Sequence, residues 1–295
     1  INNARGNAIT AAYVIKNQSN NRSWNYSASL TKLMSHGFSL KSGFSYGVSK
    51  SMVEPSSTAG SSWGSANPIT RDPNNPELAY SQNSPGHRFF TQASYSKQYF
   101  GFGATTVSVY FENRTNGNTS YIFSGDANGD TVSQNDLIYI PRNTSEMNFT
   151  TFTTGGRTYP AAEQAAAFEA YIVQDKYLSA HRGEYAKRGA VFLPALNRMD
   201  LSITQDLFKR LGGKRHSGSI RLDVTNFGNM LNSNWGAGKR IINTQILTNP
   251  TVDATGALAY RMQLLGGNYI TQSHQTTAGL SDVYTAMLSF RYTFN

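Results

Sequence analysis

The chain has 295 residues, 26 of them Lys or Arg and 17 Asp or Glu, so its formal net charge is +9. It contains no cysteine, which excludes a disulfide scaffold and any metal or redox site built on thiolates. No run approaches the roughly 18 consecutive apolar residues of a membrane-spanning helix. The basic residues are spread singly, so the positive charge does not indicate a nucleic-acid binder.

Alternation of apolar and polar residues predicts a series of β-strands. In the first half of the chain the pattern is clearest at 38–49 and 106–111, and weaker at 11–16, 23–34 and 88–99. In the second half it recurs at 198–207, 220–225 and 283–294, and more weakly at 240–247 and 257–265. These segments predict an all-β fold with about ten strands.

Connections of two lengths alternate between these segments. Short links are expected at 35–37, 100–103, 211–218 and 249–256, and long loops at 51–86, 117–196, 231–239 and 266–282. The short link at 17–21 breaks the alternation. Short turns at one end and long loops at the other are typical of bacterial outer-membrane β-barrels, whose long loops are extracellular.

The 117–196 connection is too long to lack structure of its own. Its segment 160–173 begins with proline and continues with strong helix formers, which predicts a short helix. Phe168, Tyr171, Ile172 and Asp175 share one face of that helix. Packing within the loop explains this face more simply than ligand binding does.

The last segment, 283–294, has the strongest strand pattern. Its even-numbered residues from Tyr284 to Phe294 are apolar or aromatic, and the residues between them are mostly polar. At ~3.3 Å per residue and a tilt of ~40°, such a strand crosses the roughly 25–30 Å apolar layer of a bilayer. A soluble strand is usually about half that length. The segment predicts a transmembrane antiparallel β-barrel, with a soluble β-sandwich as the alternative.

Residues 125–136 fit two interpretations. Asp126, Asn128 and Asp130 occupy positions 1, 3 and 5 of a calcium-loop pattern, and Asp136 supplies a later carboxylate. The pattern is shortened, and Thr131 stands where a standard loop has glycine. Alternating Asp, Asn and Gly is also ordinary turn chemistry, so a calcium loop and a metal-free turn both remain open.

The sequence carries no catalytic motif. The five histidines show no paired metal-ligand spacing, and neither a nucleophile elbow nor a phosphate-binding loop is present. His87 and His181 lie near expected loop-side strand ends but have no acidic partner near in sequence. We therefore expect no enzyme activity and no catalytic or cofactor-binding residue. Charged residues on the polar strand faces are expected to hydrogen-bond along a barrel wall: Asp200, Arg221, Asp223 and Arg291.

Four stretches carry a family resemblance. They are Ser84-Pro-Gly-His-Arg-Phe-Phe; the segment 125–142, which begins Gly-Asp-Ala-Asn-Gly-Asp; the segment 177–188 with 197–206; and Leu222-Asp-Val-Thr-Asn-Phe-Gly-Asn. With these motifs the chain resembles the C-terminal barrel part of a TonB-dependent receptor, particularly the Oar-like and SusC-like receptors of Bacteroidetes. One departure is Asn295, which follows the terminal aromatic residue.

The resemblance implies a 22-stranded barrel in the outer membrane of a Gram-negative bacterium. Residues 1–295 would be one part of its barrel domain, with loop insertions at about 51–86 and 117–196. The family's N-terminal plug, which contacts the TonB–ExbB–ExbD energising complex, has no counterpart in this sequence. A SusD-like surface lipoprotein, outer-membrane lipid and lipopolysaccharide are the other implied partners.

The expected function is to bind a nutrient at the extracellular loops and to form the barrel wall for its energised uptake. The first alternative is a non-transporting surface barrel that serves as an adhesin or assembly scaffold. The second is a self-contained ten-stranded outer-membrane protease or lipase. The chain begins Ile-Asn-Asn without a secretion signal, so we expect that a signal or a longer segment precedes it.

Overall fold

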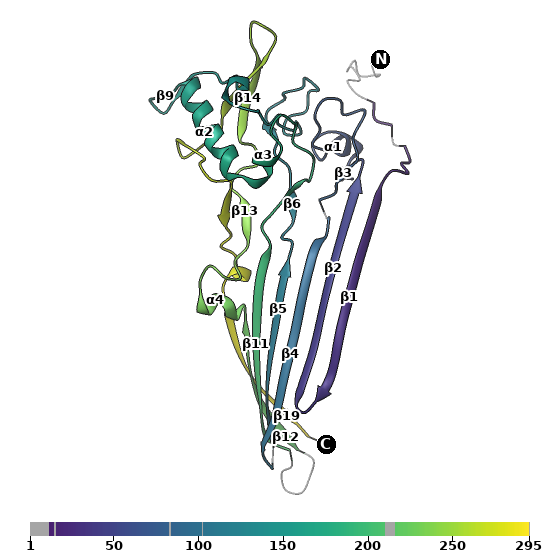
Figure 1. Cartoon of the computed structure of the whole chain (residues 1–295). Coiled ribbons are helices and arrows are strands. Elements are labelled where there is room, and N and C mark those ends of the chain that lie inside the picture. Colours follow the sequence, from purple (N-terminus) through teal and green to yellow (C-terminus); the bar gives the residue numbers. More distant parts are fainter. Residues whose placement is uncertain (1–11, 15, 83, 102, 210–215, 295) are drawn as a thin grey trace, which may run out of the picture.

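The computed structural model describes residues 12–14, 16–82, 84–101, 103–209 and 216–294. Its main feature is one sheet of long antiparallel strands (Figure 1). In spatial order these are β1 (Arg22–Ser35), β2 (Phe38–Ser51), β4 (Gly86–Phe100), β5 (Gly103–Arg114), β11 (Leu196–Phe208), β12 (Ser217–Thr225) and β19 (Thr285–Thr293). The short strand β3 (Ala79–Tyr80) pairs with the end of β2. A predominantly β chain with antiparallel sheets is therefore confirmed.

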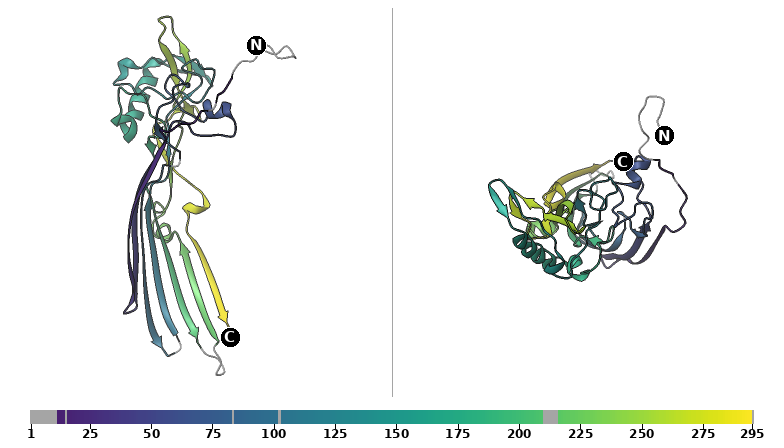
Figure 2. Two further views of the ribbon diagram at one scale, coloured as in Figure 1. Left: turned by 90° about the vertical axis from the view of Figure 1, so that its right-hand side faces the viewer. Right: turned by 90° about the horizontal axis from the view of Figure 1, so that it is seen from above.

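The short connections lie at one end of this sheet and the long ones at the other (Figures 1 and 2). The β1–β2 turn is His36-Gly37, and both residues have positive φ, 51° and 79°. This pattern is typical of a two-residue type I′ turn, whose twist matches that of antiparallel strands. β4 and β5, and β11 and β12, also meet at this end. The connections 52–85, 115–195 and 226–284 lie at the other end, and we call these three together the cap.

The predicted number of strands was wrong, because the sheet has seven long strands rather than about ten. The segments 240–247 and 257–265 do not join it. They contribute to β13 (Lys239–Ile241), β14 (Leu247–Val252), β15 (Leu258–Met262) and β16 (Leu264–Leu265) in the cap. The described residues of 11–16 form no strand, and the part of the predicted link 211–218 up to residue 215 lies outside the described residues.

The links predicted at 231–239, 249–256 and 266–282 all fall within the single connection 226–284. The link at 249–256 is a turn between β14 and β15, rather than a turn at the far end of the sheet. The error has a physical reason. A short strand that buries one face in the cap has the same period of two as a long strand that buries one face elsewhere.

The register of the long strands separates apolar from polar side chains across the whole sheet. Residues that face each other across antiparallel strands lie on the same face of the sheet. One row of paired residues, from β2 to β19, is entirely apolar: Leu40, Ala93, Val109, Leu201, Val224 and Ala286. The adjacent row, on the opposite face, is polar except at its last member: Ser39, Ser94, Ser108, Ser202, Asp223 and Met287.

The apolar face of the sheet is not covered by protein. Every residue of β1 is exposed, and Leu30 remains 66% exposed. At the opposite edge, Leu288 is 73% and Phe290 64% exposed. Of the described side chains in the seven long strands, Val224 is the one apolar residue that is buried, at 7% exposed. These strands lie in a single sheet, which contradicts the β-sandwich alternative.

The hydrophobic core lies in the cap. Its largest fully buried side chains include Tyr121, Ile138, Phe168, Tyr171 and Met262. The predicted helix is present as α2 (Ala161–Gln174), with Pro160 preceding its first turn. Its predicted common face is buried in this core, which confirms the packing interpretation.

Asp175 follows α2 and caps the next helix, α3 (Lys176–Ala180). Its Oδ1 accepts hydrogen bonds from the backbone N–H groups of Tyr177 and Leu178, both at 2.9 Å. The Tyr121 hydroxyl donates to its Oδ2 at 2.7 Å. These bonds satisfy a carboxylate that is only 1% exposed.

The other elements of the cap are short. They are α1 (Ala59–Trp63), β6 (Asn118–Thr119), β7 (Phe123–Ser124), β8 (Phe152–Thr154), β9 (Arg157–Tyr159), β10 (Val191–Phe192), α4 (Phe227–Leu231), β17 (Asn268–Tyr269) and β18 (His274–Thr276). Single 3₁₀ turns occupy Thr144–Glu146 and Leu280–Asp282. Within the described ranges, no helix combines the length and the apolar character needed to cross a membrane.

The position of the core predicts different effects for two phenylalanine truncations. Phe168→Ala leaves a cavity in the cap and should cost about 3–5 kcal/mol of its stability. Phe44→Ala, on the uncovered face of β2, should leave the cap unchanged. Hydrogen exchange of the α2 amides measures the local opening free energy. Equal protection of α2 in both variants would contradict a core located in the cap.

Candidate functional site

The predicted metal-ligating residues share one loop, where most of their oxygen atoms accept hydrogen bonds from the loop itself. Asp126 accepts from the backbone N–H groups of Gly129 and Thr131, at 2.7 and 2.9 Å. Asn128 Oδ1 accepts from Asp130 N at 2.8 Å. Asp130 Oδ1 accepts from Val132 N at 2.8 Å. These are the side-chain-to-backbone bonds by which Asp and Asn stabilise turns.

Asp136 closes this loop from a buried position. Only 2% of its surface is exposed, and its Oδ2 accepts from Ala127 N at 2.7 Å, whereas its Oδ1 has no hydrogen-bond partner. Burial raises the pKa of the Asp136 carboxyl from 3.8 to about 6, and the nearby carboxylates of Asp130 and Asp126 add to the rise. The fully buried Asn135 also has an unpartnered Oδ1.

The fit of this loop to calcium is partial. The unpartnered oxygens of Asn135 and Asp136 are suitable cation ligands, but the other oxygens already accept hydrogen bonds. Among the described residues, no group of three or more His, Asp or Glu side chains is placed to hold a metal ion. Most oxygens of the turn are thus satisfied by its own N–H groups, but Asn135 Oδ1 and Asp136 Oδ1 are not, and calcium binding stays a prediction.

The raised pKa of Asp136 predicts a pH dependence of loop stability. Folding favours the protonated carboxyl, so this contribution is present below about pH 4 and is lost as pH rises through about 6. Asp136→Asn should remove that dependence. Hydrogen exchange of residues 126–136 between pH 4 and 8, in both proteins, measures the difference. If calcium binds here, adding it at pH 7 should restore the hydrogen-exchange protection that the wild-type loop loses as Asp136 ionises. An identical pH profile in the two proteins would contradict the raised pKa of Asp136.

The two histidines near the loop side have no carboxylate partner among the residues that the structure describes. His87 Nε2 lies 2.9 Å from Asn113 Oδ1, and its Nδ1 lies 3.1 Å from Thr115 Oγ1. His181 Nδ1 lies 2.8 Å from the carbonyl of Tyr177. These contacts tie neighbouring segments together and do not assemble the nucleophile, base and acid of a hydrolase.

The charged residues on the polar face of the sheet pair along their own strands. Asp200 lies 3.1 Å from Arg198, and Asp223 lies 2.8 Å from Arg221. Arg291 stands opposite Ser219 on the same face. The predicted hydrogen bonding along the polar face is therefore present for Asp200, Arg221 and Asp223, and the barrel wall stays a prediction.

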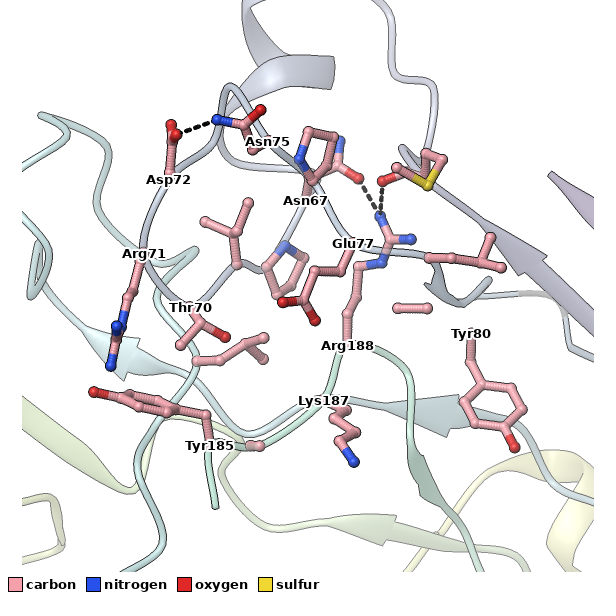
Figure 3. Close-up of a pocket in the computed structure, with 18 of the residues that line it drawn as sticks. Asn67, Thr70, Arg71, Asp72, Asn75, Glu77, Tyr80, Tyr185, Lys187 and Arg188 are labelled. Carbon is pink, nitrogen blue, oxygen red and sulfur yellow. Dashed lines mark hydrogen bonds between the residues drawn. The ribbon is translucent and has the colours of Figure 1, made fainter. Parts of the chain in front are cut away.

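The cap contains a cavity of about 550 Å³ that the sequence analysis missed (Figure 3). Two chain segments, 67–80 and 184–188, form most of its lining, together with Lys50 and Met52 at the end of β2. Leu137 lies between the segments. Its N–H donates to the Ile69 carbonyl at 2.8 Å, while the next residue, Ile138, accepts from Ala186 N at 2.8 Å. One extended segment therefore fixes both walls.

Arg188 is the most buried charged residue of this cavity, at 6% exposed. Its guanidinium donates to Asn67 Oδ1 at 2.6 Å, to the Met52 carbonyl at 3.1 Å, and to the carbonyl and hydroxyl of Ser51. Its Nε–H is buried and has no acceptor. Burial lowers the pKa of Arg188, which Glu54 partly opposes. Within the described part of the chain, no carboxylate forms an ion pair with it.

The other cations of the cavity come from three different segments. Lys50 lies 4.8 Å from the centre of the Tyr80 ring, and Arg71 lies 5.5 Å from that of Tyr185. Lys187 forms an ion pair with Glu184 at 3.4 Å. Apolar side chains line the space between them: Ile69, Leu78, Leu137 and Ala186. The site thus combines apolar walls with cationic groups, a common composition for ligand pockets.

Gly189 sets the close packing beside Arg188. Its φ is +65°, and a Cβ at this position would lie 2.5 Å from the carbonyl oxygen of Tyr80. Only glycine avoids this contact and tolerates this backbone conformation. The residue therefore allows the Arg188 segment to lie directly against β3.

Comparison with protein-family models, with curated proteins and with solved structures gives no match to this chain. The class that the structure defines is a predominantly β protein, whose long antiparallel sheet carries a loop-built cap with its own core and cavity.

Proposed function

We propose that this chain forms part of the wall and the outer loops of an outer-membrane transport barrel of the TonB-dependent receptor type. The observation that carries the proposal is the register of the sheet, which aligns apolar residues in rows on one face and polar residues on the other from β2 to β19. Strands of 9 to 15 residues, with short turns at one end and long loops at the other, support the same conclusion.

The uncovered apolar face favours lipid as its natural surroundings. Exposing so many aromatic and aliphatic side chains to water is unfavourable by roughly 25 cal/mol per Å² of apolar surface. Within a bilayer the edge strands β1 and β19 also require hydrogen-bonding partners, because unpaired backbone groups are costly in hydrocarbon. Further strands of the same barrel wall would satisfy both edges.

The polar face is suited to line an aqueous interior. Ser94 and Thr106 form cross-strand hydroxyl bonds to Ser108 and Ser96, at 2.8 and 2.9 Å. Arg88 pairs with Glu112 at 2.6 Å. Two aromatic residues, Phe90 and Tyr110, interrupt the polar character of this face and stack on each other. In a closed barrel these hydroxyl and charged groups would line a hydrated path for the nutrient.

In this proposal the cap faces outside the cell and collects the nutrient. The short turns lie at the opposite end of the sheet, as the periplasmic turns of such barrels do (Figure 2). Uptake would be energised by the TonB–ExbB–ExbD complex through a plug domain, and a SusD-like lipoprotein would be a partner at the cap. The cap cavity supports ligand collection over the surface-enzyme alternative, because His87 and His181 lack acidic partners among the described residues.

Two neighbouring residues of β19 test the proposal. Leu288 lies on the apolar face and Met287 on the opposite face, paired with Asp223; they are 73% and 59% exposed. An arginine on the lipid face costs about 2–4 kcal/mol near the bilayer midplane, whereas an interior position tolerates it. Leu288→Arg should therefore reduce the folded, heat-modifiable protein in outer-membrane fractions, and Met287→Arg should not.

The matched pair separates a membrane sheet from a soluble one. On a water-exposed sheet, both substitutions would place a charge in solvent and both variants would fold equally. Equal folded yields of Leu288→Arg, Met287→Arg and the wild type, or recovery of all three as soluble protein, would contradict the proposed function.

A further inference from the structure

We infer that the cap cavity binds an organic anion, with a carboxylate at the buried Arg188 and an apolar body against the cavity walls. This inference deepens the proposed function by naming the chemical class of the collected ligand. It rests on that function only in identifying the ligand as cargo, because binding itself does not depend on transport.

The first argument is the charge of Arg188. Removing a cation from water costs several kcal/mol even after relaxation, unless a counter-charge is supplied. Arg188 is 6% exposed and, among the described residues, has no carboxylate within ion-pair distance. Its hydrogen bonds go to neutral carbonyl, amide and hydroxyl groups of Ser51, Met52 and Asn67. Glu54 offsets only part of the effect of burial, and its carboxylate accepts from the Ser51 hydroxyl at 2.7 Å rather than from Arg188. A neutral side chain could donate the same hydrogen bonds without the cost of burying a charge. The presence of a charged arginine therefore points to an anionic partner.

The second argument is that one donor of the Arg188 guanidinium has no acceptor. Buried polar atoms in folded proteins nearly always have a partner. The Nε–H of Arg188 has none, although this residue lines a cavity of about 550 Å³. Nε itself is enclosed, so pairing it with a ligand requires the Arg188 side chain to turn toward the cavity, where an anionic oxygen would satisfy the donor and supply the counter-charge together. A guanidinium favours carboxylate and phosphate oxygens for this role.

The third argument is the balance of charge in the remaining lining. Lys50 and Arg71 contact aromatic rings and, within the described ranges, form no ion pair. Of the lining carboxylates, Asp72 accepts from Asn74 N at 2.9 Å, and Glu184 pairs with Lys187. Glu77 is the third acidic residue of the lining and is exposed. Among the described lining residues, three cations without a carboxylate partner, Lys50, Arg71 and Arg188, therefore stand against two carboxylates without a cationic partner, Asp72 and Glu77.

The size and walls of the cavity select the rest of the ligand. Its volume falls within the roughly 300–1,000 Å³ of small-molecule sites. Ile69, Leu78 and Leu137 offer apolar contact, and Tyr80 and Tyr185 add aromatic rings at different sides of the opening (Figure 3). A carboxylate attached to an apolar or aromatic body fits this composition better than a small inorganic anion does.

The test measures binding of hippurate, an aromatic carboxylate, to the full protein in detergent micelles by isothermal titration calorimetry. Hippuramide, in which a neutral amide replaces the carboxylate, is the matched ligand control. We expect saturable hippurate binding at least tenfold tighter than hippuramide binding. Phenyl phosphate and inorganic phosphate, added as competitors, distinguish a carboxylate site from a phosphate site. Stronger binding of either phosphate compound would overturn the carboxylate assignment.

Variants locate the site. Arg188→Met should weaken hippurate binding at least tenfold, but it also removes the bonds to Ser51, Met52 and Asn67. Arg71→Gln therefore provides a second test. Arg71 is exposed and contacts the Tyr185 ring, so its loss should not disturb the packing of the cap. It should weaken binding about threefold to tenfold and leave the cap folded, as judged by hydrogen exchange. Lys176→Gln, which removes an exposed charge on α3, should have no effect.

The outcomes separate this inference from the proposed function. Equal binding of hippurate by the wild type, Arg188→Met and Arg71→Gln would overturn the inference, as would the absence of binding to a folded cap. Outer-membrane fractionation of the same preparations tests the proposed function independently. A protein that assembles in the membrane without binding hippurate would retain the function and lose this ligand class.

Discussion

The uncovered apolar face of the long sheet is the constraint on which the rest of the structure depends. Period-two alternation in each strand would be unremarkable alone, but the pairing register aligns it into continuous apolar rows. Among the described residues nothing packs over these rows, and Val224 is the one buried apolar residue of the long strands. Apolar surroundings would stabilise a sheet of this kind, and this is the physical basis of the membrane location proposed above.

The chain consequently divides into two parts that are stabilised differently. The sheet is stabilised by backbone pairing and, in the proposed function, by lipid; the cap folds around its own core of aromatic and aliphatic side chains. The cap is therefore a preformed structure at the end of the sheet. Its cavity walls are fixed by backbone pairing through residues 135–138, so a ligand site there does not require reorganisation of flexible loops.

Local patterns in the sequence predicted part of this structure. Alternation located the seven long strands, and helix formers after Pro160 located α2 and its buried face. The pattern failed at 240–247 and 257–265, because short cap strands and long sheet strands share the same period. The local pattern also located the Asp126–Asp136 turn, whose side-chain oxygens accept from its own backbone N–H groups, while calcium binding there stays a prediction.

The cavity could not be predicted in this way. It joins residues 67–80 to residues 184–188, which are far apart in the sequence. They come together through the backbone of Leu137 and Ile138, which pairs with both, and through the bond from Arg188 to Asn67. Arg188 belonged to a stretch noted only for its family resemblance, and nothing in its sequence neighbourhood shows that it is buried. Its burial and its unpartnered Nε–H become visible only when Ser51, Met52 and Asn67 are placed around it.

The most direct measurement of the central claim is lipid exposure along β12, using single cysteines in a chain that has none of its own. Ile220→Cys, Arg221→Cys, Leu222→Cys and Asp223→Cys would be labelled in outer membranes with a membrane-impermeant maleimide. Protection of positions 220 and 222, with labelling of 221 and 223, is the predicted result. Equal labelling of all four positions would contradict a sheet whose apolar face lies in lipid.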